Sequence, residues 1–197
     1  MPEVKYPVVQ IFTSIQGEGL HMGLPVTFIR LAGCNLRCTW CDTPQAFDSS
    51  QARWQTAEEI VAQAIPTRLV VITGGEPTLH DLGSLVEALK KRHKYVAIET
   101  NGTNEIPAAW GIDWITASPK PASGYILRCV PNELKYVVDD AFNLEVIAWQ
   151  AVPKGNILLQ VESGRPESAA KAYRLVLERP DWELRLGIQL HKVIAVE

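Results

Sequence analysis

The sequence of 197 residues predicts an α/β fold, a partial (β/α)6-type open barrel with a mostly parallel sheet. Apolar runs of strand length alternate with segments of helical pattern, mostly with short connections, and this order is typical of parallel βαβ units. About six strands follow one another in this way. A closed barrel of eight units takes roughly 250 residues, so it does not fit this length. We expect one domain over residues 1–197.

Each element is predicted from its local pattern. The expected strands are 26–31, 68–73, 95–100, 113–117, 134–138 and 156–161, with at least one more within 182–196. The expected helices are 56–64, with Thr56 and Glu59 as a capping box, 81–93, with Asp81 as its cap, 140–150, and 166–177, with Pro166 in its first turn. Ligands of parallel sheets bind at the carboxyl ends of the strands, so residues that follow these strands should face one mouth.

Composition and charge exclude several classes of protein. The chain carries 22 acidic and 19 basic residues and a formal net charge of −3, so no net positive field favours a nucleic-acid backbone. Its longest apolar runs, such as 69–72, are far shorter than the roughly 20 residues of a membrane span. Residues 1–10 lack the apolar core of a secretion signal. We therefore expect a cytoplasmic globular protein without direct contact to nucleic acid or membrane.

Three of the four cysteines form a cluster, while Cys129 stands apart and is interpreted as a bystander. Cys34, Cys38 and Cys41 follow a predicted strand with the spacing C-x3-C-x2-C. Three thiolates can hold three irons of a cubane and leave the fourth iron open to a substrate or cofactor, whereas ordinary electron-transfer clusters use four cysteines. A zinc site or three buried structural cysteines remain alternatives, although structural zinc normally takes a fourth ligand.

This cysteine pattern, with Trp40 just before the last cysteine, resembles the signature of the radical S-adenosylmethionine enzymes. The resemblance implies a [4Fe–4S] cluster whose open iron binds S-adenosylmethionine, and a partial barrel of the kind predicted above. Gly74-Gly75-Glu76-Pro77 resembles the motif that binds the methionyl amino group in that family. Taken alone, two glycines could equally form a plain turn before a helix.

Further motifs follow the later strands. Lys120 in Ser118-Pro119-Lys120 could pair with a carboxylate, although Ser-Pro is also a common turn, and Gln160 could bond ribose or adenine or be an ordinary polar residue. The sequence has Val161 where the family commonly has proline. The resemblance implies that S-adenosylmethionine is lined by Trp40, Cys41, Asp42, Gly75, Ser118, Pro119, Lys120, Gln160, Val161, Glu162 and Ser163.

Other residues indicate a small charged substrate. Gln16 and Glu18 lie in a glycine-flanked stretch and can form hydrogen bonds with amide and amine groups of a substrate. Arg30 lies inside a strand, where its charge is costly unless it pairs with a substrate carboxylate or an internal acid. The Thr43 hydroxyl could bind Mg²⁺ together with the substrate. The sequence ends at Glu197, and a terminal carboxylate could accept hydrogen bonds from a guanine-like amino group.

Together, these stretches resemble the radical S-adenosylmethionine lyases that make the deazapurine precursor of queuosine. The implied reaction converts 6-carboxy-5,6,7,8-tetrahydropterin to 7-carboxy-7-deazaguanine and ammonia. The resemblance also implies that Thr43 binds Mg²⁺, that the protein forms a homodimer, and that it has an electron donor such as flavodoxin as a partner. The pterin would be faced by Ile15, Gln16, Gly17, Glu18, Arg30, Thr73, His191 and the main-chain carboxylate of Glu197. The alternatives are an activase that makes a glycyl radical in a partner protein, and a non-catalytic iron–sulfur or zinc protein.

Overall fold

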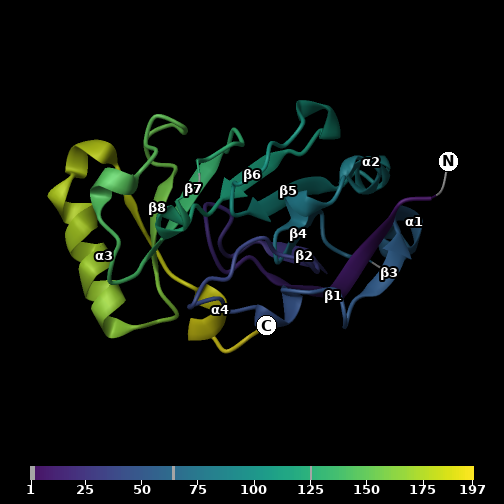
Figure 1. Ribbon diagram of the computed structural model, residues 1–197, viewed down its shortest axis with the longest axis horizontal. Helices are drawn as coiled ribbons and strands as arrows, with labels where there is room; N and C mark the ends of the chain where they lie inside the picture. The colour runs from purple at the N-terminus through teal and green to yellow at the C-terminus, as the bar shows by residue number, and fades with distance from the viewer. Residues whose placement is uncertain (1–2, 64, 125) are drawn as a thin grey trace.

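One open sheet organises the computed structural model, which describes residues 3–63, 65–124 and 126–197 (Figure 1). In these ranges it has nine strands in the order β3-β1-β2-β4-β5-β6-β7-β8-β9. Strands β2 and β4 to β9 run parallel, and β1 pairs antiparallel with β2 and β3. Their bounds are β1 Lys5–Ile15, β2 Pro25–Leu31, β3 Arg53–Thr56, β4 Leu69–Gly74, β5 Tyr95–Thr100, β6 Trp114–Ala117, β7 Glu133–Val138, β8 Ile157–Val161 and β9 Arg185–Gly187.

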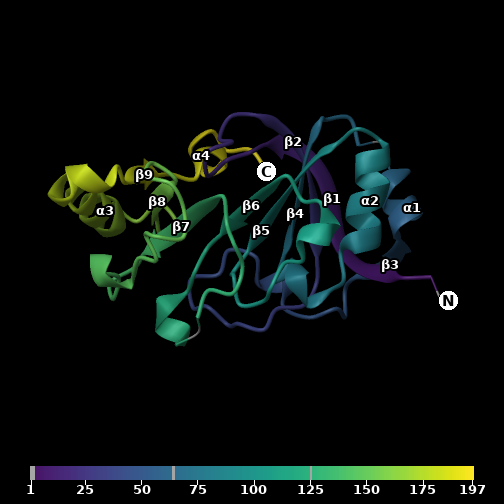
Figure 2. The same ribbon diagram turned by 90° about the horizontal axis from the view of Figure 1, so that it is seen from above.

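The helices are few, and they lie toward the two ends of the sheet (Figure 2). Helices α1 (Ala57–Val61) and α2 (Gly83–Lys91) lie together near β1 and β3, and α3 (Pro166–Glu178) covers β7 and β8. Helix α4 is the short segment Leu190–Val193. Between β5 and β8 the described connections hold only 3-10 turns. The predicted open, mostly parallel α/β architecture is confirmed, with fewer crossover helices than a complete (β/α)6 unit would have.

Two apolar cores support the sheet. The first lies between β2, β4, β5 and the inner face of α2, where Ile29, Ile72, Leu85 and Leu89 are fully buried. The second joins β7 and β8 to α3. Burial of each large aliphatic side chain contributes roughly 1.5–3 kcal/mol. The two cores lie toward opposite ends of the sheet, and strands of both carry polar residues of the mouth, such as Arg30 on β2 and Gln160 on β8.

Side-chain hydrogen bonds lie at the starts of the first two helices, but only α1 has a side-chain N-cap. The predicted cap Asp81 lies one residue before Leu82, the N-cap of α2, which has no side-chain capping bond. Thr56 Oγ1 accepts a hydrogen bond from the Glu59 N–H at 3.1 Å, and Glu59 Oε2 accepts one from the Thr56 N–H at 2.8 Å, so the predicted capping box is confirmed. Asp81 Oδ1 accepts from the Gly83 N–H at 3.0 Å, next to the start of α2. Helix α1 is shorter than predicted, and the expected last residue, Ala64, lies outside the described residues.

The predicted helix over 140–150 is wrong. The segment forms turns around the 3-10 turn Leu144–Val146. Asp139 and Asn143 accept hydrogen bonds from the backbone N–H groups two residues further on, at 3.1 and 2.9 Å. Such side-chain bonds compete with a helix for the same donors. The apolar residues that suggested a helix face instead pack as a loop, with Phe142 and Ile147 buried in the second core.

The final strand is also much shorter than predicted, since β9 spans only Arg185–Gly187. The alternating apolar residues beyond Leu184 are not one buried face, because Leu186 and Ile188 are exposed. The chain then turns into α4. Strands β1 and β3 were not expected, and they add two antiparallel members at one edge of the sheet. Within the described ranges, no helix is long and apolar enough to cross a membrane.

Candidate functional site

The main pocket lies at the carboxyl ends of the parallel strands, as the βαβ pattern predicts. It is bordered by the segments that follow β2, β4, β5, β6 and β8, and by α4 and the loop after β1. The structure brings nearly all the predicted site residues to this pocket; Pro119 instead lines a neighbouring hollow, to which Trp40 and Lys120 also contribute. The residues in the main pocket are Ile15, Gln16, Gly17, Glu18, Arg30, Cys34, Cys38, Trp40, Cys41, Asp42, Thr43, Thr73, Gly75, Ser118, Lys120, Gln160, Val161, Glu162, Ser163, His191 and Glu197.

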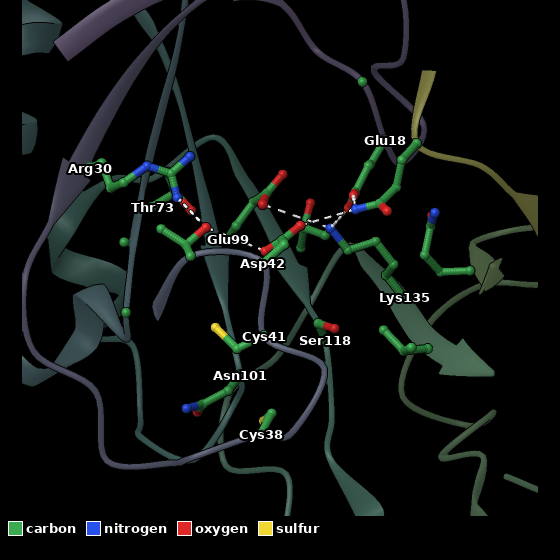
Figure 3. A pocket seen from close by; sticks show the side chains of 18 of the residues that line it. Glu18, Arg30, Cys38, Cys41, Asp42, Thr73, Glu99, Asn101, Ser118 and Lys135 are labelled. Carbon is green, nitrogen blue, oxygen red and sulfur yellow. Dashed lines mark hydrogen bonds and ion pairs between the residues drawn. The ribbon is translucent and has the colours of Figure 1, made fainter. Parts of the chain in front are cut away.

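The three clustered cysteines line this pocket from the cysteine loop, residues 32–43. Figure 3 labels two of them, Cys38 and Cys41. Their side chains are partly exposed, and burial raises the pKa of the Cys34 and Cys38 thiols. In the described part of the chain, no three His, Cys, Asp or Glu side chains converge on one metal position. A cubane does not require such convergence, because each thiolate binds a different iron. The loop therefore fits a cluster better than a single zinc ion, while Cys129 is buried away from it.

Backbone contacts hold the cysteine loop against the end of β4. The Gly75 N–H donates to Leu31 O at 3.1 Å, and the Glu76 N–H donates to Gly33 O at 2.7 Å. A Cβ on Gly75 would lie 2.2 Å from Gly33 O, so only glycine allows this approach. The double glycine is therefore more than a plain turn, because it brings the cysteine loop and β4 into direct contact.

Glu76 of the same motif points into the protein. It is fully buried and accepts hydrogen bonds from the Thr78 N–H at 3.0 Å, the Thr100 hydroxyl at 2.7 Å and the Asn101 N–H at 2.6 Å. Hydrogen bonds to a buried carboxylate contribute about 1.5–3 kcal/mol each. Glu76 thus ties the end of β4 to the end of β5 and shapes the floor under the cysteine loop.

The side of the pocket beyond β6 and β8 has polar atoms suited to a bound nucleoside. Gln160 is buried, and neither its Nε2 nor its Oε1 has a hydrogen-bond partner within the described structure. Lys120 donates to the Ser118 hydroxyl at 2.7 Å and lies 5.2 Å from the centre of the Trp40 ring. Burial lowers the pKa of Lys120 to about 8. The Gln160 amide can form hydrogen bonds with a ligand that supplies both a donor and an acceptor.

The opposite side of the pocket has a cation beside an aromatic pair. Arg30 Nη1 donates to the Thr43 hydroxyl at 2.8 Å, and its guanidinium carbon lies 5.8 Å from the centre of the Phe12 ring. Phe12 stacks on Phe28 with ring centres 5.0 Å apart. Among the described residues, Arg30 forms no salt bridge and its buried Nε has no partner. The internal acid that was one alternative for Arg30 is therefore not found there, and a ligand carboxylate fits the position.

Two glutamates and a lysine form the bottom of the pocket (Figure 3). Lys135 pairs with Glu18, and its Nζ lies 3.7 Å from Glu99 Oε2. Gln16 Nε2 donates to Glu99 Oε1 at 3.0 Å. Burial opposes the charge of Glu18, but the Lys135 ammonium outweighs it and lowers the pKa of that carboxyl. The bottom of the pocket thus presents carboxyl oxygens as acceptors to any ligand with N–H donors.

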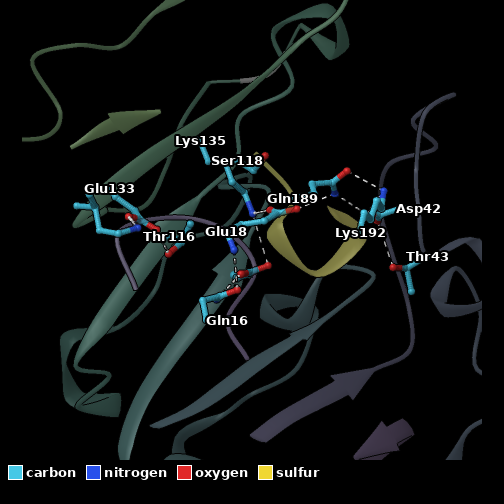
Figure 4. Close-up of polar contacts among 12 residues, drawn as sticks. Gln16, Glu18, Asp42, Thr43, Thr116, Ser118, Glu133, Lys135, Gln189 and Lys192 are labelled. Atoms are coloured by element: carbon cyan, nitrogen blue, oxygen red, sulfur yellow. Dashed lines mark hydrogen bonds and ion pairs between the residues drawn. The ribbon is translucent and has the colours of Figure 1, made fainter. Parts of the chain in front are cut away.

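Helix α4 closes one side of the mouth through polar contacts (Figure 4). Gln189 Nε2 donates to Glu18 Oε1 at 2.7 Å and to Asp42 Oδ2 at 3.1 Å, which joins the loop after β1 to the cysteine loop. The Leu190 N–H donates to Gly17 O at 2.9 Å. His191 therefore reaches the mouth from a short helix rather than from the predicted strand. Glu197 O accepts a hydrogen bond from the Ser14 hydroxyl.

Sequence reasoning missed several residues that line this pocket, and five of them carry its charges, its aromatic pair or its contact with α4. Glu99 could have been found, because it lies near the carboxyl end of a predicted strand, as the other site residues do. Lys135 carries the same signal as Arg30, a charge inside an apolar strand. Phe12 and Gln189 had no such signal, because β1 was not expected and α4 was predicted as a strand. These five residues are Phe12, Phe28, Glu99, Lys135 and Gln189.

Comparison with known proteins gives a consistent result. Residues 28–122 match the Radical SAM superfamily. The chain is 37% identical over 203 residues to a 7-carboxy-7-deazaguanine synthase from Synechocystis sp., covering 98% of this chain and 94% of that protein. It is 40% identical over 200 residues to the one from Aquifex aeolicus, covering 93% and 90%. The crystal structure of QueE from Escherichia coli has a TM-score of 0.75 and 29% identity, and the match covers 95% of each chain.

Proposed function

Because the chain belongs to the 7-carboxy-7-deazaguanine synthases of the radical SAM superfamily, we propose that its main pocket converts 6-carboxy-5,6,7,8-tetrahydropterin to 7-carboxy-7-deazaguanine and ammonia. The enzyme is a radical S-adenosylmethionine lyase with a [4Fe–4S] cluster. One observation carries the substrate proposal. The cysteine loop and the Arg30 guanidinium, which has no acidic partner among the described residues, line the same pocket. We treat residues 1–197 as one domain with one site.

The side of the pocket at the cysteine loop would hold the cofactors. Cys34, Cys38 and Cys41 would hold the cluster, and the bound cluster and S-adenosylmethionine supply a 5′-deoxyadenosyl radical. Gln160 offers a donor and an acceptor to the adenosine part. The remaining proposed contacts are Trp40, Asp42, Gly75, Ser118, Pro119, Lys120, Val161, Glu162 and Ser163, of which Pro119 acts from the neighbouring hollow.

The other side would hold the pterin by its two polar ends. Arg30 would pair with the substrate carboxylate, and its contact with Phe12 keeps the guanidinium over the pocket. Glu18 and Glu99 would accept hydrogen bonds from the N–H groups of the pyrimidine ring. The other proposed contacts are Ile15, Gln16, Gly17, Thr73, His191 and the main chain of Glu197.

Mg²⁺ would bind between the two sides of the pocket. The Thr43 hydroxyl lies beside Arg30 and accepts its hydrogen bond, and it also donates to Asp42 Oδ1 at 3.3 Å. A substrate carboxylate paired with Arg30 would thus bring its oxygens close to Thr43. One hydroxyl is a weak ligand, so the substrate and waters would supply the rest of an octahedral shell.

The protein's own residues would control where the ring rearrangement takes place. Arg30, Glu18 and Glu99 fix the ends of the ring, so that hydrogen leaves C6 and later returns without the ring changing position. Helix α4 limits the access of water to the reacting ring. S-adenosylmethionine is regenerated in this scheme rather than consumed. We further propose a homodimer in the cytoplasm, with an electron donor such as flavodoxin.

The two alternatives explain the pocket less well. A glycyl-radical activase acts on a protein segment and has no use for buried carboxylates at the pocket bottom. A non-catalytic iron–sulfur or zinc protein has no use for Arg30 or for the unsatisfied Gln160. Both alternatives also disagree with the relatives, which are named as synthases of a small molecule.

The test is turnover by anaerobically reconstituted enzyme with reductant, Mg²⁺, S-adenosylmethionine and 6-carboxy-5,6,7,8-tetrahydropterin. We expect 7-carboxy-7-deazaguanine by mass detection, with one ammonia for each product molecule. A reconstituted enzyme that cleaves S-adenosylmethionine but leaves the pterin unchanged would refute the substrate assignment. An enzyme with no 5′-deoxyadenosine under any condition would favour the non-catalytic alternative.

A further inference from the structure

Lys135 is a buried cation in the main pocket that the reaction described above does not use. It lies within β7, and its side chain is only 8% exposed. The neighbours Leu134 and Tyr136 on this strand are fully buried. An ammonium group in such a strand costs free energy unless anions compensate it. We therefore expect the groups that face Lys135 to compensate its charge.

The groups facing Lys135 come from several elements. Glu18 approaches from the loop after β1, and Glu99 from the end of β5. Burial opposes the charge of Lys135, but these two glutamates outweigh it and raise its pKa, while Lys135 in turn lowers the pKa of Glu18. The other charged groups near enough to act on it are Glu133 on β7, Lys120 after β6 and Asp42 of the cysteine loop.

Both glutamates keep acceptor capacity for a ligand. Glu18 uses Oε2 for Lys135 and Oε1 for Gln189, and Glu99 uses Oε1 for Gln16. A carboxylate has about four acceptor positions, so each side chain can take further hydrogen bonds. Two neighbouring carboxyl groups in a buried site do not both ionise readily near neutral pH unless a cation compensates them.

We propose that Lys135 is a positioning residue for the substrate, which keeps the Glu18 carboxylate ionised and holds the Glu18 and Glu99 side chains aimed at the N–H edge of the pterin. The proposal rests on the function proposed above. Lys135 does not touch the reacting atoms. It acts through the two glutamates, so its removal should change how strongly the pterin binds and how that binding depends on pH.

The test compares pterin affinity in the wild-type holoenzyme and in Lys135→Met, with S-adenosylmethionine and Mg²⁺ present and no reductant, so that no turnover occurs. The ratio of the two dissociation constants cancels the titration of the pterin itself. Without Lys135, one glutamate should keep its proton near neutral pH. The ratio should then be about ten to a hundred at about pH 6 and fall toward about unity as pH rises to about 8.5.

Three further variants make the test specific. Lys135→Arg keeps the charge, so its affinity ratio should stay flat with pH even if the pterin binds more weakly. Lys135→Gln keeps a donor to Glu18 without the charge, and it carries the same test where Lys135→Met does not fold. Lys91→Met removes a lysine whose side chain is 71% exposed, and it should match wild type.

The outcomes separate the two proposals. A flat ratio in both neutral variants, in enzyme that binds S-adenosylmethionine normally, would overturn the role of Lys135 and leave the pterin assignment standing. A pH-dependent ratio in Lys135→Arg as well would overturn the charge argument. A wild-type holoenzyme that does not bind the pterin would overturn the proposed function, and this inference with it.

Discussion

Gly17→Ala tests whether α4 places His191 in the mouth. A Cβ on Gly17 would lie 2.0 Å from His191 Nδ1 and 2.8 Å from its Cγ, whereas ordinary contact begins at 3.4 Å. The φ angle of Gly17 is not in the left-handed region, so alanine strains the site through lack of space rather than through its backbone. The imidazole of His191 must therefore move by more than an ångström, since all the nearest atoms belong to its side chain.

The size of the effect follows from that displacement. A shift of about 1 Å in a group that positions a substrate can cost about a hundredfold in rate, and overpacking costs about 1–3 kcal/mol. We expect the kcat/KM for the pterin to fall about ten- to a hundredfold, with cluster content and S-adenosylmethionine binding unchanged.

The matched control is the same substitution in a His191→Ala background. Without the ring, most of the clash disappears, so the double variant should be no worse than His191→Ala alone. The assay is steady-state turnover of the four proteins with varied pterin. If Gly17→Ala and His191→Ala multiply their effects independently, the contact between them is not what matters, and the reasoning is wrong.

The remaining predictions address the cluster, the metal and the fold. Replacing any one of Cys34, Cys38 and Cys41 by Ala should abolish cluster assembly and turnover, while Cys129→Ala should keep both. Iron and sulfide analysis of each variant measures cluster assembly. A normal cluster in Cys38→Ala would contradict the assignment. Thr43→Ala should lose the stimulation by Mg²⁺ after chelation, and Thr43→Ser should retain it because the hydroxyl remains; turnover at varied Mg²⁺ measures this, and an enzyme indifferent to chelators would remove Mg²⁺ from the account. Thr56→Ala removes the cap of α1, which lies far from the mouth. It should lower the free energy of unfolding by about 1 kcal/mol and the Tm by about 2–4 °C without changing turnover. An unchanged thermal transition would show that the capping box contributes nothing to stability.

Most of the parallel sheet could be predicted, because its strands are continuous apolar runs that end at glycine or polar residues. The run 68–73 before Gly74 is an example, and the structure has β4 there. Strand β1 was missed because its side chains do not form a continuous buried run, and only Tyr6, Pro7 and Val8 are buried along its eleven residues. Such a strand is defined by its antiparallel partners, which a local pattern does not reveal.

The 140–150 region shows a second limit. Its apolar residues are spaced as on a helix face, but Asp139 and Asn143 cap backbone N–H groups nearby and favour turns. Similarly, Leu184, Leu186 and Ile188 alternate as in a buried strand, yet the sheet ends at β9 and leaves the last two exposed. In both cases the local sequence pattern fits two structures, and contacts with the rest of the protein determine which one forms.

The site was more predictable than these connections. Its residues follow the strands whose carboxyl ends meet, so a correct strand order brings Cys34, Gly75, Ser118 and Gln160 to one pocket. The network of Lys135 with Glu18 and Glu99 could not be inferred in the same way, because it joins three segments far apart in the sequence. Its geometry depends on how the loop after β1 lies over β5 and β7.

The central claim is that the cofactor side and the pterin side of one pocket act on the same hydrogen. Substrate deuterated at C6 tests this directly, in enzyme supplied with reductant, Mg²⁺ and S-adenosylmethionine. We predict deuterium in the recovered S-adenosylmethionine, together with 7-carboxy-7-deazaguanine as product. Deazapurine formed while all the recovered S-adenosylmethionine stays unlabelled would contradict the account.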